Sequence, residues 1–132
     1  MTLLIDTAIR DYNKKFMSLI CRLRRKDRFD VDIDSLYKKV VTAKMTCEDS
    51  IIRTTGPYLY KYRGVIEEGQ FLDYEFEELH NLPEKWAFVH NIVDKIRNIY
   101  CGAPADERDQ VLADVKCLLI FYENFISYSA TQ

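Results

Sequence analysis

Residues 83–100 read PEKWAFVHNIVDKIRNIY, and this stretch decides the fold class. Its apolar side chains recur every three or four residues, which is the spacing of one face of an α-helix. That face holds Trp86, Val89, Ile92 or Val93, Ile96, and Ile99 or Tyr100. Proline suits the first turn of a helix, and Gly102 and Pro104 follow the last apolar residue. The pattern predicts a helix over 83–101 with one buried face.

The region that follows predicts a second long helix, over 106–127. Acidic residues in its first turn (Asp106, Glu107 and Asp109) complement the positive end of a helix dipole. Its centre, VKCLLIFYENFI at 115–126, is apolar over much of its circumference. A helix of that kind lies in the middle of a bundle or forms a subunit interface.

The N-terminal region predicts a third long helix, over 3–26. Its apolar stripe recurs at helical spacing through Ile5, Ile9, Tyr12, Phe16, Leu19 or Ile20, and Leu23. The helix ends in the basic turn RLRRK at 22–26, which complements the negative end of its dipole.

The segment after that helix is expected to be an extended connector, over 27–34. Apolar and acidic residues alternate at 29–34, which is typical of a short strand, but no second strand is available to pair with it. Asp34 is then the expected N-cap of a helix over 34–54.

Gly56 and Pro57 are expected to stop or sharply bend that helix. Proline favours the first turn of a helix, so Pro57 is expected near the start of a short helix over 57–68. Gly69 ends it, and an acidic, aromatic connector follows at 69–82. Together the segments predict an all-α, single-domain bundle of about five helices, spanning residues 1–132 (3–26, 34–54, 57–68, 83–101 and 106–127).

Composition narrows the class of protein further. Of 132 residues, 48% are hydrophobic and 30% are charged, which is a globular balance rather than a disordered one. The longest apolar run is far shorter than the roughly 20 residues that a membrane span needs, and the first residues do not form a signal peptide. The four cysteines are widely spaced, so we expect reduced thiols, no disulfide framework and an intracellular location.

Charge is distributed unevenly along the chain. Residues 1–65 hold fourteen Lys or Arg and eight Asp or Glu, a net charge of +6, whereas residues 66–132 hold five and thirteen, a net charge of −8. Such asymmetry bears on partners and on self-association rather than on fold.

The sequence contains no recognisable catalytic constellation, phosphate loop or metal-ligand ladder, so we expect neither enzymatic activity nor a cofactor. His90 precedes Asp94 by one helical turn, which suggests a carboxylate-oriented base or, more simply, a surface pair. His80 follows Glu77 and Glu78, but these residues lack a diagnostic ligand spacing. The Glu-x-x-His pattern at 77–80 occurs once, whereas di-iron bundles use it twice.

Two aromatic segments are candidate partner-binding surfaces. In FLDYEFEEL, at 71–79, aromatic side chains can anchor a partner while carboxylates steer it. Its candidate contact residues are Phe71, Tyr74, Glu75, Phe76, Glu77 and Glu78. Alternatively, the segment is a loop whose apolar side chains cover one end of the core. In PYLYKYR, at 57–63, Tyr58 and Tyr62 are expected either to be exposed to a partner or to be partly buried.

The basic end of the first predicted helix is the candidate nucleic-acid site. Its side chains could neutralise several phosphates: Arg22, Arg24, Arg25, Lys26 and Arg28. No base-stacking motif accompanies them, and aspartates follow at once, which would oppose DNA. The alternative is a dipole-complementing helix end that meets an acidic surface.

Residues 56–79, GPYLYKYRGVIEEGQFLDYEFEEL, resemble small uncharacterised helical proteins that large double-stranded DNA viruses encode. The resemblance covers under a fifth of the chain and rests on GPYLYKYR followed by an aromatic and acidic run. It implies a protein that works inside an infected cell or within the virion, and it carries no catalytic residues.

These observations favour a non-enzymatic helical protein that binds a protein partner or a second copy of itself. A nucleic-acid-binding protein that uses the basic helix end is the first alternative. A helical bundle that holds a small ligand in an aromatic-lined pocket is the second.

Overall fold

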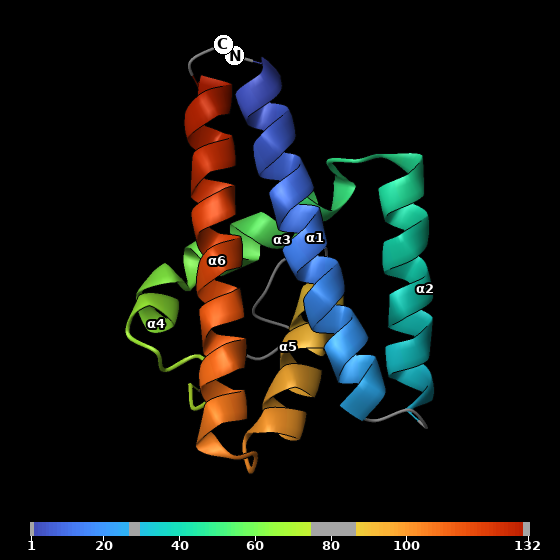
Figure 1. The fold of residues 1–132 in the computed structure, drawn as a ribbon, viewed down its shortest axis with the longest axis vertical. Coiled ribbons are helices and arrows are strands. Elements are labelled where there is room, and N and C mark those ends of the chain that lie inside the picture. Colours follow the sequence, from blue (N-terminus) through green and yellow to red (C-terminus); the bar gives the residue numbers. More distant parts are fainter. Residues whose placement is uncertain (1, 27–29, 75–86, 131–132) are drawn as a thin grey trace.

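The structure is a computed structural model that describes residues 2–26, 30–74 and 87–130. Within these ranges the chain forms six helices and no strand, so the expected all-α bundle is confirmed (Figure 1). The helices are α1 (Thr2–Lys26), α2 (Val31–Thr46), α3 (Ser50–Lys61), α4 (Arg63–Glu67), α5 (Ala87–Tyr100) and α6 (Ala105–Ala130). No helix in the described ranges is long and apolar enough to cross a membrane.

The two longest helices, α1 and α6, lie side by side in opposite directions, with the chain ends at the same end of the pair (Figure 1). Helix α2 packs on the other side of α1, while α3 passes behind α6 and α4 contacts α6 from the left in Figure 1. Contacts with α1, α3 and α4 explain why the centre of α6 is apolar around much of its circumference. Its core residues, including Val115, Leu118 and Phe125, are buried within a single chain.

The expected connector at 27–34 is wrong for residues 31–34, which belong to α2. Asp34 is not the N-cap. Instead, Asp30 Oδ1 accepts a hydrogen bond from the backbone N–H of Ile33 at 3.2 Å, as an N-cap side chain does. The alternation of apolar and acidic residues here does not mark a strand with one buried face. Ile33 faces the core, whereas Val31 is 79% exposed. The helix satisfies its backbone groups locally, whereas an isolated strand would leave them unpaired.

The expected helix over 34–54 is in fact two helices that meet at residues 47–49. Helix α3 continues through Gly56 and Pro57, so these residues neither end one helix nor open the next. A Cβ on Gly56 would lie 2.1 Å from Cδ1 of Tyr122, so glycine permits the close approach of α3 to α6. Packing against α6 therefore outweighs the local tendency of a Gly-Pro pair to break a helix.

Gly69 ends α4 as expected. Its φ of 73° is the left-handed conformation that favours glycine. The backbone N–H of Gln70 donates to Val65 O at 3.0 Å and that of Gly69 donates to Ile66 O at 3.1 Å, which is the Schellman arrangement.

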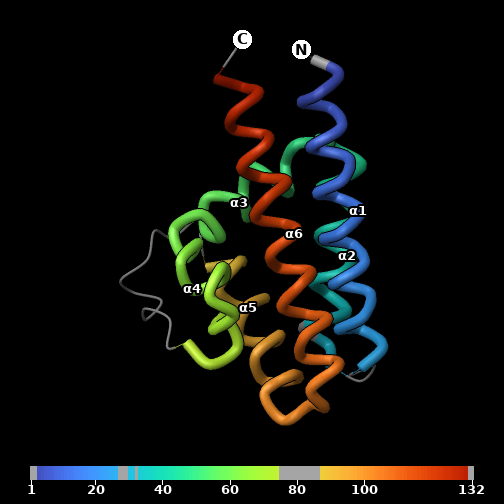
Figure 2. The backbone as a smooth tube through the Cα atoms, turned by 60° about the vertical axis from the view of Figure 1, so that its left-hand side comes forward, coloured from blue at the N-terminus to red at the C-terminus, as the bar shows by residue number. Residues whose placement is uncertain are grey.

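The core lies between α1, α6 and the four other helices, α2, α3, α4 and α5, each of which contributes buried residues (Figure 2). On α5, the predicted buried face is confirmed by Val89, Ile92, Val93, Ile96 and Tyr100. The predicted start of this helix, at residues 83–86, lies outside the described residues, as does most of the connector at 69–82.

Candidate functional site

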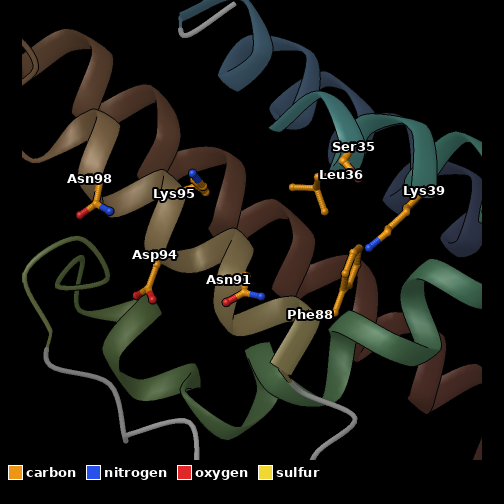
Figure 3. A pocket seen from close by; sticks show the side chains of 8 residues that line it. All are labelled: Ser35, Leu36, Lys39, Phe88, Asn91, Asp94, Lys95 and Asn98. Carbon is orange, nitrogen blue, oxygen red and sulfur yellow. The ribbon is translucent and has the colours of Figure 1, made fainter. Parts of the chain in front are cut away.

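A hollow lined by both polar and apolar side chains lies between α2 and α5, and we call it the α2–α5 groove (Figure 3). Its volume is about 400 Å³. Its lining comes from both helices: Ser35, Leu36, Lys39, Phe88, Asn91, Asp94, Lys95 and Asn98. Leu36 points into the gap from α2, and Lys39 reaches across it toward Phe88 on α5. The groove therefore offers a small apolar surface beside amide and ammonium donors.

One carboxylate holds the two walls of this groove together at one end. Asp30 Oδ2 accepts a hydrogen bond from Lys95 Nζ at 2.7 Å while Asp30 Oδ1 caps α2. The Asp30 and Lys95 side chains are 18% and 29% exposed, so the ion pair is largely screened from water. Because Lys39 and Phe88 line the other end, α2 and α5 run in opposite directions along the groove.

A second, smaller hollow adjoins the groove at the end lined by Lys39 and Phe88. It has a volume of about 80 Å³ and shares these two residues with the groove. Its remaining lining comes from α1, α2 and α3: Phe16, Val40, Ala43, Ser50, Ile51, Thr54 and Thr55. Four of these seven side chains are apolar and three carry hydroxyl groups, so this smaller hollow is the more apolar of the two.

The charged side chains of the groove differ in whether they have a partner of opposite charge. Lys95 is paired with Asp30, and Asp94 Oδ2 lies 3.6 Å from Nε2 of His90. Lys39 is exposed and forms no ion pair within residues 2–26, 30–74 and 87–130. The ammonium group available to a ligand is therefore that of Lys39, at the junction of the two hollows.

His90 belongs to the α3–α5 contact rather than to the groove lining. Its Nδ1 lies 3.2 Å from the hydroxyl of Tyr58, and its side chain is 12% exposed. The two rings meet edge to face with centroids 6.5 Å apart. The expected pairing of His90 with Asp94 is present, at an N–O distance of 3.6 Å. Tyr58 is fully buried, so its contact with His90 links α3 to α5 and does not face a cavity.

The aromatic residues expected at a partner surface are mostly in the core. Tyr58, Tyr62 and Phe71 are 0%, 5% and 1% exposed, so the two tyrosines are not exposed to a partner and are more deeply buried than the partial burial of the alternative. Tyr58 and Tyr62 are one helical turn apart, so they lie on the same side with ring centroids 5.0 Å apart. Tyr58 contacts His90 of α5, and Tyr62 contacts Tyr74. Phe71 and Leu72 instead cover the core, as the alternative interpretation of this segment predicts.

Tyr74 is the one described partner candidate that reaches the surface, with 37% exposure. It also contacts Tyr62, with ring centroids 5.9 Å apart. The remaining candidates of this segment, together with the histidine that follows, lie outside the described residues: Glu75, Phe76, Glu77, Glu78 and His80.

The basic end of α1 is largely paired with carboxylates of the same chain. Arg22 donates to Asp114 on α6, and Lys26 donates to Glu107 at the start of α6. Arg24 lies 3.0 Å from Asp34 on α2. The opposite charges of the two halves of the chain therefore meet within one molecule.

Two members of the basic cluster differ from the rest. Arg25 is exposed and lines a hollow of about 420 Å³ with Cys21, Arg24 and Asp34, whereas Arg28 lies outside the described residues. Because Asp34 shares this hollow, nucleic acid would meet a carboxylate beside the two arginines.

The cysteines are free thiols within the described chain, and no group of three potential metal ligands gathers there. Cys47 donates a hydrogen bond from Sγ to Asp49 Oδ1 at 2.8 Å. That hydrogen bond to a carboxylate raises the pKa of the Cys47 thiol and lowers the pKa of Asp49. A raised pKa makes Cys47 a poorer nucleophile than an ordinary exposed cysteine.

Sequence patterns did not identify the residues that make the groove. Asn91, Lys95 and Asn98 recur at i, i+4 and i+7, which is the ordinary pattern of a solvent-facing helix side. Asp30 was one of several alternating aspartates that could each cap a helix. The capping signal was present, but its position depended on where α2 begins.

Comparison with protein-family models, with curated proteins and with solved structures finds no significant match to this chain. The resemblance of residues 56–79 to viral helical proteins and the expected intracellular location stay predictions. Function therefore has to be argued from the geometry of the molecule.

Proposed function

We propose that this chain is a non-enzymatic binding protein that takes a small ligand into the α2–α5 groove. The carrying observation is that a groove of about 400 Å³ with a mixed polar and apolar lining adjoins a smaller, mainly apolar hollow, with Lys39 and Phe88 common to both linings. Ligand sites in proteins have volumes of roughly 300–1,000 Å³ and combine apolar walls with a few polar groups. The groove has that size and composition.

Two contacts support binding rather than chemical conversion. The Cys47 thiol is held by Asp49, which raises its pKa, and His90 is held between Tyr58 and Asp94. Both side chains are engaged by other side chains of the protein, while the groove itself presents amides, ammonium groups and the carboxylate of Asp94. Such groups orient a ligand by hydrogen bonds.

Asn91→Trp tests the proposal, because Asn91 is exposed and an indole there would fill the groove without altering the core. A fragment library is titrated into ¹⁵N-labelled protein and backbone resonances are followed by NMR. We expect fragments to shift the resonances of residues 35–39 and 88–98, and we expect N91W to abolish those shifts. Asn124→Trp is the matched control, because Asn124 is an exposed residue of α6. Shifts that persist in N91W, or that map to other surfaces, would contradict the proposal.

Protein binding is the second candidate function, and it is supported by exposed apolar side chains. Val31 and Met45 are 79% and 83% exposed at the two ends of α2, and Tyr74 is 37% exposed next to the acidic segment. Aromatic and methionine side chains are enriched at protein interfaces. This candidate ranks second because three of the expected partner residues are buried.

The protein-binding candidate has its own test. Tyr74→Ala and Met45→Ser remove exposed apolar contacts, whereas N91W fills the groove. We expect a protein partner that uses these surfaces to lose affinity for Y74A or M45S and to keep its affinity for N91W. The reverse pattern, measured by calorimetry with the purified partner, would reject this second function.

A further inference from the structure

We infer that the ligand of the α2–α5 groove is a small amphipathic organic anion. Its anionic head would bind at Lys39, and its apolar part would enter the adjoining hollow of about 80 Å³. This inference rests on the proposed function and adds the chemical class of the ligand.

The electrostatics at the Lys39 end of the groove favour an anion. Lys95 Nζ is already bound to Asp30 at 2.7 Å. The Asp94 carboxylate also lines the groove, but it lies on α5 beyond Asn91, 3.6 Å from Nε2 of His90, whereas Lys39 lies at the end lined by Phe88. Lys39 forms no ion pair in the described part of the chain, and Asn91 can donate an amide N–H close to it. An anion near Lys39 gains a charge-assisted hydrogen bond, whereas a cation there is repelled.

The lining of the smaller hollow indicates that the ligand also has an apolar part. Phe16, Val40 and Ile51 line the inner hollow together with the ring of Phe88. The hollow takes about three methylene groups, if each occupies roughly 30 Å³, the volume of a water molecule in the liquid. A purely polar anion would leave this surface without a partner, so a short alkyl or acyl chain fits it better.

The experiment uses straight-chain carboxylates from acetate to octanoate, the alcohols of the same lengths, and hexyl phosphate. Each compound is titrated into ¹⁵N-labelled protein and followed by NMR. We expect carboxylate affinity to rise about fourfold per methylene until about three methylenes fill the hollow, and then to level off. We expect alcohols to bind about tenfold more weakly than carboxylates of equal length. Hexyl phosphate distinguishes a phosphate head from a carboxylate head, and either head supports an anionic ligand.

Two variants test the assignment of head and tail. Lys39→Met keeps an unbranched apolar side chain but removes the charge, and we expect about a tenfold loss of carboxylate affinity with alcohol binding unchanged. Lys44→Met is the matched control on the same helix, because Lys44 is exposed and lines neither hollow. Ala43→Leu narrows the inner hollow, so we expect it to remove the gain per methylene while acetate binding persists.

The outcomes separate this inference from the proposed function. Equal binding of alcohols and carboxylates in the groove, or an unchanged affinity in K39M, would overturn the anionic ligand and leave groove binding intact. Absence of binding by these compounds and by the fragment library would overturn both. Because Lys39 is exposed, K39M is expected to fold normally, and its circular dichroism and melting temperature check this.

Discussion

Gly56 shows how one missing side chain sets the distance between two helices. The ring of Tyr122 lies against it, and an added Cβ would overlap Cγ, Cδ1 and Cε1 of that ring at 2.1–2.7 Å. Glycine is otherwise unfavourable in a helix interior, by roughly 1 kcal/mol relative to alanine. The contact therefore explains why glycine occupies the middle of α3.

Gly56→Ala is expected to destabilise the protein. The displaced Tyr122 ring should cost about 1–3 kcal/mol, which outweighs the gain in helix propensity. Urea denaturation followed by circular dichroism measures the change. Gly64→Ala is the control, because nothing lies within 4 Å of a Cβ there, and we expect it to be neutral or slightly stabilising. Equal stability of G56A and the original chain would contradict the close contact between Gly56 of α3 and Tyr122 of α6.

Tyr12 is expected to make the free energy of unfolding depend on pH in the alkaline range. It is fully buried between helices, and its hydroxyl is hydrogen-bonded to Thr55, which donates to Ile51 O at 2.8 Å. Burial raises the pKa of Tyr12 far above the ordinary value of about 10. The unfolded chain therefore loses this proton at a lower pH than the folded chain does, and the free energy of unfolding falls as pH rises beyond about 10.

Tyr12→Phe tests this dependence. Below pH 9 we expect the variant to be less stable by about 1 kcal/mol, because it loses a buried hydrogen bond. Above about pH 10 the original chain should lose up to roughly 1.4 kcal/mol more per pH unit than Y12F does. Urea titrations between pH 7 and 12 measure the two slopes, and parallel slopes would refute the assignment to Tyr12.

At the scale of elements, α2 is held by its N-terminus and by its contacts with α1. Asp30 caps α2 and binds Lys95 of α5, and Asp34 binds Arg24 of α1 and Lys38. The hydrogen bond from Lys38 and the charge of Arg24 lower the pKa of Asp34. Two aspartates four residues apart thus tie one helix to two neighbours.

Replacement of Asp30 separates the cap from the ion pair. Asp30→Ala removes both and should cost about 1–2 kcal/mol of stability, whereas Asp30→Asn keeps a capping oxygen and should cost less than about 1 kcal/mol. Thermal and urea denaturation measure both changes. Asp109→Ala is the control, because Asp109 is exposed and forms no ion pair in the described part of the chain. If D30A and D109A unfold alike, Asp30 has no such double role.

At the scale of the whole molecule, a single chain covers its own central helix. Helix α6 is buried by α1, α3 and α4, and its carboxylates receive the basic side chains of α1. Asp114 is 1% exposed and lies 3.4 Å from Lys15, beside Arg22. The chain itself buries Val115, Leu118, Leu119 and Phe125 of α6 and neutralises this carboxylate, while Ile120 stays 53% exposed.

We therefore expect the purified chain to be monomeric and to melt at a temperature that does not depend on protein concentration. Size-exclusion chromatography with light scattering, from micromolar to millimolar protein, gives the mass, and calorimetry gives the melting temperature. A dimeric mass at micromolar concentration, or a melting temperature that rises with concentration, would show that α6 takes part in a subunit interface.

Much of the bundle could be predicted because helical periodicity is a local property. The apolar stripes of α1, α5 and α6 follow directly from residue spacing, and their buried faces agree with it. The predicted helix boundaries were wrong at residues 31–34 and 47–57. In these short segments the residue types are compatible with a strand, a helix cap or a helix break. Tertiary contacts, such as the Tyr122 ring on Gly56, decided between those alternatives.

The sequence by itself determined the helical class, the buried faces of the long helices and the turn at Gly69, since each depends on residues within a few positions of one another. Only the tertiary structure decided that Tyr58 and Tyr62 face the core, that the basic end of α1 meets α6, and that Lys39 faces α5 across a groove. The Tyr58–His90 and Arg22–Asp114 contacts, for example, join side chains that are 32 and 92 residues apart. Spacing along one helix specifies which faces are polar, and the packing of the bundle specifies which of those faces meet.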